Sequence, residues 1–154
     1  MDRKKRIEEL RRKNTITNLC KTWINNGINI SIENFLGIEE TLSLQNKILS
    51  KIDEMNCQNA CNIYGRDEMN IVSVYIKELE NNICSREDYV FFARESTEIG
   101  GIILQGNVII EKKEFIVKES ELSFTNCCIF LSSLNAEKGI CLWRGEYDIR
   151  IYIW

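Results

Sequence analysis

The sequence contains no histidine and no proline. Without histidine, the chain has no Ser-His or Cys-His nucleophile pair and no imidazole ligand for a metal. Without proline, its turns depend on Gly, Asn, Asp and Ser. It also has no run approaching the roughly 20 apolar residues that a membrane-spanning helix requires. These absences argue against thiol or serine catalysis and against a membrane span, and we expect the protein not to be an enzyme.

Cysteine, by contrast, occurs seven times, which is an odd number. The N-terminal stretch "MDRKKRIEELRRK" is charged where a secretory signal has an apolar core, so we expect a cytoplasmic protein with reduced, mostly buried thiols. Cys57 and Cys61 in "CQNAC" have a spacing that can serve a metal, but zinc sites usually contain a second such pair. We therefore predict no metal site and no cofactor. Whether Cys57 and Cys61 bind a metal ion is left open.

Charge is distributed unevenly along the chain. Residues 1–26 hold eight Lys or Arg against three Asp or Glu, whereas the remaining residues hold twelve against twenty. Clustered cations can contact phosphates, so the basic N-terminus is a candidate nucleic-acid contact. Glu8 and Glu9, however, are spaced for pairing with Arg12 and Lys13 within one helix. We interpret the segment as a solvated helix end and do not expect nucleic acid to be the main partner.

The spacing of apolar residues predicts helices in the first half of the chain. A basic helix is expected within residues 1–26, ending at the Asn25-Asn26-Gly27 stop signal. A helical part is expected over residues 39–81. It contains one helix over 39–55 and a second from about residue 67 to 81, although "IVSVYI" in the latter also fits a strand.

From Tyr89 the pattern becomes that of β-strands. The run "YVFFAR" (89–94) is dense in apolar residues, and "GGIILQGNVIIE" (100–111) predicts a hairpin with Gly106-Asn107 as a two-residue turn. Residues 115–117 and 127–134 are predicted to be further strands.

Residues 139–154, "GICLWRGEYDIRIYIW", predict a second hairpin with Arg144-Gly145 as its turn. This register places Ile140 opposite Ile149 and Leu142 opposite Tyr147. The core side of the last strand is then Tyr147, Ile149, Ile151 and Ile153, and its other side is Asp148, Arg150, Tyr152 and Trp154.

These elements predict one α+β domain over residues 1–154. Its N-terminal helices are expected to pack on one face of a mostly antiparallel β-sheet of about five or six strands, formed by residues 89–154. The second sheet face is then either a binding surface or a face that helices also cover.

Two features are candidates for partner binding. Aromatic residues beside charges on the outer sheet face are typical of interface anchors. Carboxylates around "YVFFAR" can mimic phosphates and attract a basic partner, or they form an ordinary solvated surface. The candidate partner-binding residues are Glu87, Asp88, Glu95, Glu98, Trp143, Glu146, Asp148, Tyr152 and Trp154.

The chain has many Ile, Asn and Lys residues, which is typical of proteins from AT-rich bacterial or phage genomes. In this composition, in its size and in the carboxylates bracketing "YVFFARESTE", it resembles the immunity proteins of bacterial polymorphic and contact-dependent toxin systems. The resemblance implies a cytoplasmic protein that binds a cognate toxin domain, which we expect to be a basic nuclease, and occludes its active site. The alternative is a small regulatory or phage-encoded protein whose basic N-terminal helix contacts nucleic acid while the sheet domain dimerises. The oligomeric state is not predicted.

Overall fold

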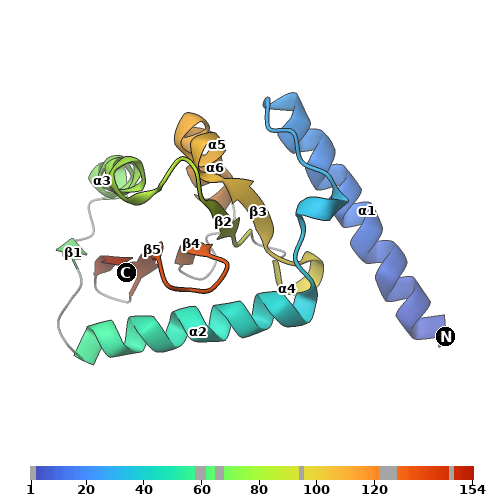
Figure 1. Cartoon of the computed structure of the whole chain (residues 1–154), viewed down its shortest axis with the longest axis horizontal. Coiled ribbons are helices and arrows are strands. Elements are labelled where there is room, and N and C mark those ends of the chain that lie inside the picture. Colours follow the sequence, from blue (N-terminus) through green and yellow to red (C-terminus); the bar gives the residue numbers. More distant parts are fainter. Residues whose placement is uncertain (1–2, 58–61, 65–67, 94–95, 122–127, 146–147) are drawn as a thin grey trace.

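A computed structural model describes residues 3–57, 62–64, 68–93, 96–121, 128–145 and 148–154 of the chain. Its centre is a six-stranded sheet in the order β1-β6-β5-β4-β2-β3, in which every neighbouring pair is antiparallel. Helices lie on both sides of this sheet, as Figure 1 shows. The predicted α+β fold with an antiparallel sheet is therefore confirmed.

The described elements alternate along the chain. The helices are α1 (Arg3–Asn25), α2 (Ile38–Cys57), α3 (Glu68–Asn82), α4 (Ser96–Ile99), α5 (Gly106–Glu111) and α6 (Lys113–Glu121), with a short 3-10 helix η1 (Ile32–Asn34). The strands are β1 (Asn62–Tyr64), β2 (Asp88–Phe91), β3 (Ile102–Gln105), β4 (Cys128–Ser133), β5 (Gly139–Arg144) and β6 (Ile149–Ile153).

The two long N-terminal helices begin and end where the sequence signals predict. Helix α1 ends in a Schellman arrangement, because Gly27 has a φ of +78° and the N–H of Ile28 donates to the carbonyl of Trp23 over 3.0 Å. Helix α2 carries Glu39 and Glu40 in its first turn, where the helix dipole favours negative charge.

Alternating side chains of the strands fill two separate apolar clusters. On the first sheet face, Tyr89 and Phe91 of β2 belong to a cluster with residues of α1, α3, α5 and α6. On the second face, Val90, Phe92 and strand residues beside them pack with Leu44, Ile48 and Ile52 of α2. Figure 1 shows α2 along one side of the sheet and α3, α5 and α6 along the other. The helices are thus divided between the two faces.

The hairpin predicted for residues 100–111 is wrong, since β3 ends at Gln105 and Gly106–Glu111 forms helix α5. Gly106 does not form the predicted turn but is the first residue of α5. An added Cβ would lie 2.0 Å from the carbonyl oxygen of Cys84, so the residue allows two backbone segments to approach closely. Residues 115–117, predicted as a strand, belong to α6. Ile109 of α5 and Ile116 of α6 are both buried in the first cluster, so each of these helices packs on the sheet.

The C-terminal hairpin exists, but its predicted register is wrong. Ile140 pairs with Ile153 and Leu142 with Ile151, because the connection is longer and is closed by a hydrogen bond from Gly145 N–H to the carbonyl of Asp148. The slip from the predicted pairs is four residues, an even number, so the described side chains of β6 stay on their predicted faces. Tyr147, also predicted for the core side, lies outside the described residues. Ile149 and Ile151 are accordingly buried in the first cluster.

Candidate functional site

The aromatic sheet face predicted to meet a partner is largely covered by helix α2. Tyr152 is only 1% exposed and lies in the cluster that contains Ile48, so its predicted contact with a partner is wrong. Trp143 and Trp154 pack at the margin of this cluster and are half-buried. The indole Nε1 of Trp154 donates to the carbonyl of Ala136 over 3.0 Å. The alternative, that helices cover both faces, therefore holds for Tyr152 and in part for the two tryptophans.

The charges beside these aromatics are paired locally. The Nε of Arg150 lies 2.9 Å from Oδ2 of Asp148. Hydrogen bonding to Tyr152 and to Asp148 raises the pKa of the Arg150 guanidinium. Asp148, which directly precedes β6, thus neutralises a residue of that strand and is not a free anionic contact. Glu146, the other acid predicted here, lies outside the described residues.

The predicted acidic set does not converge on one site. Glu87 and Asp88 lie at the start of β2, whereas Glu98 lies in α4, beyond the other end of that strand. Glu95 lies outside the described residues. Asp88 is exposed and lines a groove along β3, on the edge of the sheet. The two parts of the set are therefore separated by the length of β2.

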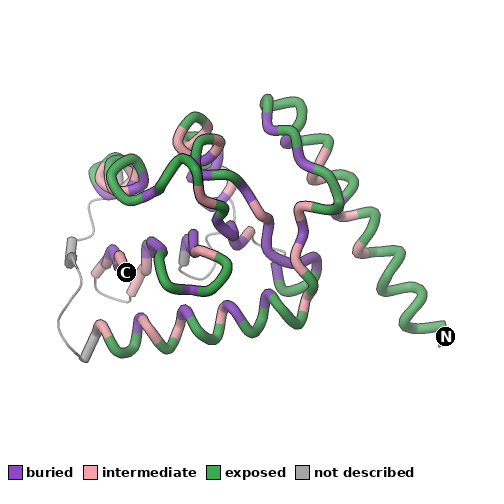
Figure 2. Tube along the Cα trace, viewed as in Figure 1, coloured by how far each residue is buried: buried purple, intermediate pink, exposed green. Residues whose placement is uncertain are grey.

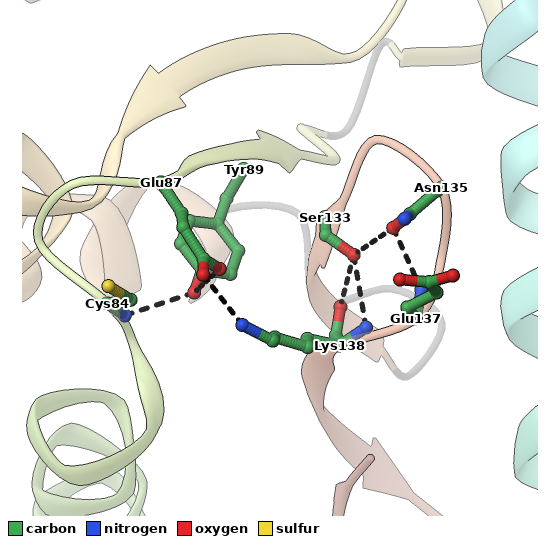
Figure 3. A network of polar contacts seen from close by, with 7 residues as sticks. All are labelled: Cys84, Glu87, Tyr89, Ser133, Asn135, Glu137 and Lys138. Atoms are coloured by element: carbon green, nitrogen blue, oxygen red, sulfur yellow. Dashed lines mark hydrogen bonds and ion pairs between the residues drawn. The ribbon is translucent and has the colours of Figure 1, made fainter.

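Glu87 is engaged in the polar network of Figure 3. Its Oε1 lies 2.6 Å from Nζ of Lys138, and its Oε2 accepts a hydrogen bond of 3.3 Å from the hydroxyl of Tyr89. That hydroxyl also accepts the backbone N–H of Cys84 over 3.0 Å. Hydrogen bonding to Lys138 lowers the pKa of the Glu87 carboxyl.

The same network fixes the turn between β4 and β5. The Oδ1 of Asn135 accepts hydrogen bonds from Ser133 Oγ over 2.8 Å and from the N–H of Glu137 over 3.1 Å. The N–H of Lys138 donates to Ser133 Oγ over 3.0 Å. Glu87 therefore ties the loop before β2 to this turn, which is a structural role (Figure 3).

A cleft that the sequence did not predict lies where α1 passes the start of α2 and the short helix α4. It has a volume of about 770 Å³. Four carboxylates and three cations contribute to its walls. The lining residues are Lys5, Glu8, Glu9, Arg11, Arg12, Thr15, Ile38, Glu39, Glu98 and Ile99. We call it the α1 cleft, and it contains one predicted site residue, Glu98.

Arg12 connects the two sides of the α1 cleft. Its guanidinium donates to the carbonyl of Ile99 through both Nε (3.2 Å) and Nη2 (3.0 Å), and Nη2 also lies 3.3 Å from the carbonyl of Leu36. These carbonyls meet because Gly100, at a φ of +98°, lets the chain turn after α4 directly beside Leu36. The sequence pattern assigned Arg12 only to pairing with Glu8, so this long-range contact was missed.

The outer half of α1, residues 3–14, extends away from the rest of the protein. Figure 2 shows its trace as almost entirely exposed. The exposed fractions of Ile7 and Leu10 reach 43% and 54%. Glu8 and Glu9 line the α1 cleft together with three cations of the same helix, whereas the exposed cations Arg3, Arg6 and Lys13 do not line it. The outer half therefore presents both acids and cations toward the cleft, and further cations toward solvent.

Neither a metal cluster nor a membrane span emerges within the described part of the chain. Its Cys, Asp and Glu side chains form no group of three or more that could hold a metal ion. Cys57 ends α2, and Cys61 lies outside the described residues. No helix in the described ranges is both long and apolar enough to cross a membrane.

No curated protein and no solved structure matches the chain. Residues 19–154 match the family model described as YxiF protein. The match includes every strand and begins inside α1, so that residues 3–18 of this helix precede it. The chain therefore belongs to the YxiF protein family.

Proposed function

We propose that this protein is an immunity-type inhibitor, which binds a cognate toxin domain with a basic surface and occludes the active site of that domain. In this proposal it acts in the cytoplasm and is not an enzyme. The observation that carries the proposal is the α1 cleft, a cavity of about 770 Å³ with carboxylates on both of its walls.

The electrostatics of the α1 cleft favour a cationic partner. Glu39 and Glu98 project from α2 and α4, and Glu8 and Glu9 from α1. Three cations, Lys5, Arg11 and Arg12, also line the cleft, so its four carboxylates exceed its cations by one. A basic side chain entering between the walls would meet carboxylates from both sides, and such complementarity speeds association and excludes wrong partners.

The test is co-expression with the protein encoded by the adjacent gene, which the proposal predicts to contain a toxin domain. We expect the two proteins to co-elute and the cells to survive. The double variant Glu39→Gln/Glu98→Gln should raise the Kd for the toxin domain at least about tenfold, or roughly 1.4 kcal/mol. The matched control is Asp53→Asn/Glu54→Gln, which makes the same charge change on exposed residues near the far end of α2 and should bind like the wild type. Wild-type protein that neither co-elutes nor protects would disprove the proposal.

A second function is favoured by the solvent-facing side of the outer half of α1. Arg3, Arg6 and Lys13 are exposed there and do not line the cleft, which suits contact with phosphates of a nucleic acid. Removing residues 1–13 would not separate the two functions, because that segment forms one wall of the α1 cleft. The triple variant Arg3→Gln/Arg6→Gln/Lys13→Gln does separate them. It should lower nucleic-acid affinity and its salt dependence, while binding of the toxin domain persists.

A further inference from the structure

The two walls of the α1 cleft differ in their relation to the family. Ile38, Glu39, Glu98 and Ile99 lie within residues 19–154, which the family model covers. The lining residues on α1, from Lys5 to Thr15, all lie before that match. One wall is thus part of the family scaffold, and the other belongs to a segment outside the family match.

The outer half of α1, which forms the wall outside the family match, has few buried side chains to hold it in place. Ile16 and Trp23 bury the inner half of α1, whereas residues 3–11 are all exposed. Between the halves, Thr15 and Thr17 donate their hydroxyls to the carbonyls of Arg11 and Lys13, over 3.1 and 2.8 Å. Such bonds slightly destabilise and often bend a helix.

Arg12 makes the long-range hydrogen bonds that hold the outer half of α1 against the rest of the protein. Its guanidinium reaches the carbonyls of Ile99 and Leu36, which belong to two different segments of the family scaffold. The fork of Arg holds such acceptors in a fixed direction, which a single ammonium group does not. One side chain therefore sets how far Glu8 and Glu9 stand from Glu39 and Glu98.

We propose that the outer half of α1 is a recognition wall, and that Arg12 is the positioning residue that holds it against the family scaffold. Arg12 acts through Glu8 and Glu9, whose carboxylates it places opposite Glu39 and Glu98. This inference rests on the proposed function, since it assumes that the α1 cleft receives cationic side chains.

The first measurement needs no partner. Hydrogen exchange of the α1 amides is followed in the full-length chain for Arg12→Gln, for the conservative Arg12→Lys, and for the control Lys21→Gln. Lys21 is an exposed residue of the same helix outside the cleft, so its substitution removes one positive charge and no tether. Arg12→Gln should speed exchange in residues 7–13 at least about tenfold and leave α2 and α3 unchanged. Arg12→Lys should give a smaller increase, and Lys21→Gln none. If the amides of residues 7–13 in Arg12→Gln exchanged at the wild-type rate, Arg12 would not hold the outer half of α1 in place.

The second measurement uses a synthetic oligoarginine peptide as the cationic probe. Charge alone predicts that Arg12→Gln binds this peptide more tightly, because the substitution removes a cation from the cleft. The positioning role predicts the opposite sign, a loss of affinity of at least about fivefold. In a double-mutant cycle, Glu8→Gln/Glu9→Gln should weaken binding in the wild-type background and have little further effect once Arg12 is replaced.

The outcomes separate this inference from the proposed function. Tighter binding by Arg12→Gln, or full additivity in the cycle, overturns the recognition wall while leaving an inhibitor that uses Glu39 and Glu98. Failure of the wild type to bind oligoarginine overturns the recognition role together with a cationic ligand for the cleft. In that case the exchange data still decide whether Arg12 tethers α1.

Discussion

The two faces of the sheet are covered very differently. Helices α1, α3, α5 and α6 contribute to the cluster on the first face, whereas α2 supplies every helical residue of the second cluster within the described parts of the chain. The strand residues differ accordingly. The first face receives Ile149 and Ile151 from β6, and the second receives Arg150, Tyr152 and Trp154. A single covering helix leaves a margin at which polar and aromatic groups reach solvent.

This difference teaches how a mixed strand face should be interpreted. Charged and aromatic residues on one side of a strand suggest an exposed binding surface. Here they lie on the sheet face that the single helix α2 covers. Tyr152 lies beneath α2, Trp154 lies at the margin, and Arg150 pairs with Asp148 beside them. We propose that the surface for a partner lies elsewhere, at the α1 cleft beside α4 and the start of α2.

The strongest test of the comparison is Trp23→Ala on the first face. Trp23 is fully buried, and its ring centroid lies 5.7 Å from that of Phe91 and 5.4 Å from that of Phe115. Removing a buried aromatic of this size should cost about 3–5 kcal/mol of unfolding free energy, measured by urea denaturation. The neighbouring Ile24 is 50% exposed, so Ile24→Ala should change stability by less than about 0.5 kcal/mol. Similar effects at the two positions would show that α1 is not part of the core.

The matching change on the second face is Ile48→Ala. Ile48 is fully buried beneath the sheet, so the cavity should cost about 2–4 kcal/mol, less than the loss of Trp23. Leu42 on the same helix is 42% exposed, and Leu42→Ala provides the control. Urea denaturation measures both variants. A cost for Ile48→Ala above that for Trp23→Ala would break the view that the second face is the thinner part of the core.

At the margin of the second face, Trp154→Phe should have a smaller effect. The substitution keeps an aromatic ring but removes the indole N–H that donates to Ala136. The net value of one such hydrogen bond is about 1 kcal/mol, and we expect a loss of that size by thermal or urea unfolding. An effect as large as that of Ile48→Ala would place Trp154 in the core proper, and no effect would show that the margin is not fixed by this bond.

The sequence predicted the parts of the fold that depend on local periodicity. Helices α1, α2 and α3, strands β2 and β4, and the faces of Ile149 and Ile151 all follow from the spacing of apolar residues. Helices α5 and α6 were missed because short apolar runs such as "VII" and "FIV" fit a buried strand as well as a helix. The register of the last hairpin was missed because the length of its connection is not fixed by alternation alone.

Of the candidate site, the sequence indicated only the carboxylate of Glu98. The α1 cleft exists because Arg12 reaches Ile99, a residue 87 positions further along the chain, and local spacing carries no information about such a contact. Glu87 and Asp148 look like free acids in the sequence, yet Lys138 and Arg150 pair with them in the fold. Whether a carboxylate is available to a partner depends on which cation the tertiary structure brings beside it.

The smallest expected effect concerns the pairing of Glu87 with Lys138. Both side chains are partly exposed, so the pair contributes little, but its pH dependence has a definite sign. The hydrogen bond with Lys138 lowers the pKa of Glu87 below its ordinary value of 4.5, so the stabilisation is complete above that value and is lost as the pH falls through the lower folded pKa. The urea midpoint of the wild type should therefore exceed that of Lys138→Gln near neutral pH, and the difference should shrink as the pH falls below the ordinary pKa of 4.5. A difference that persisted in acid would mean that Lys138 stabilises the β4–β5 turn through its aliphatic stem and not through the carboxylate of Glu87.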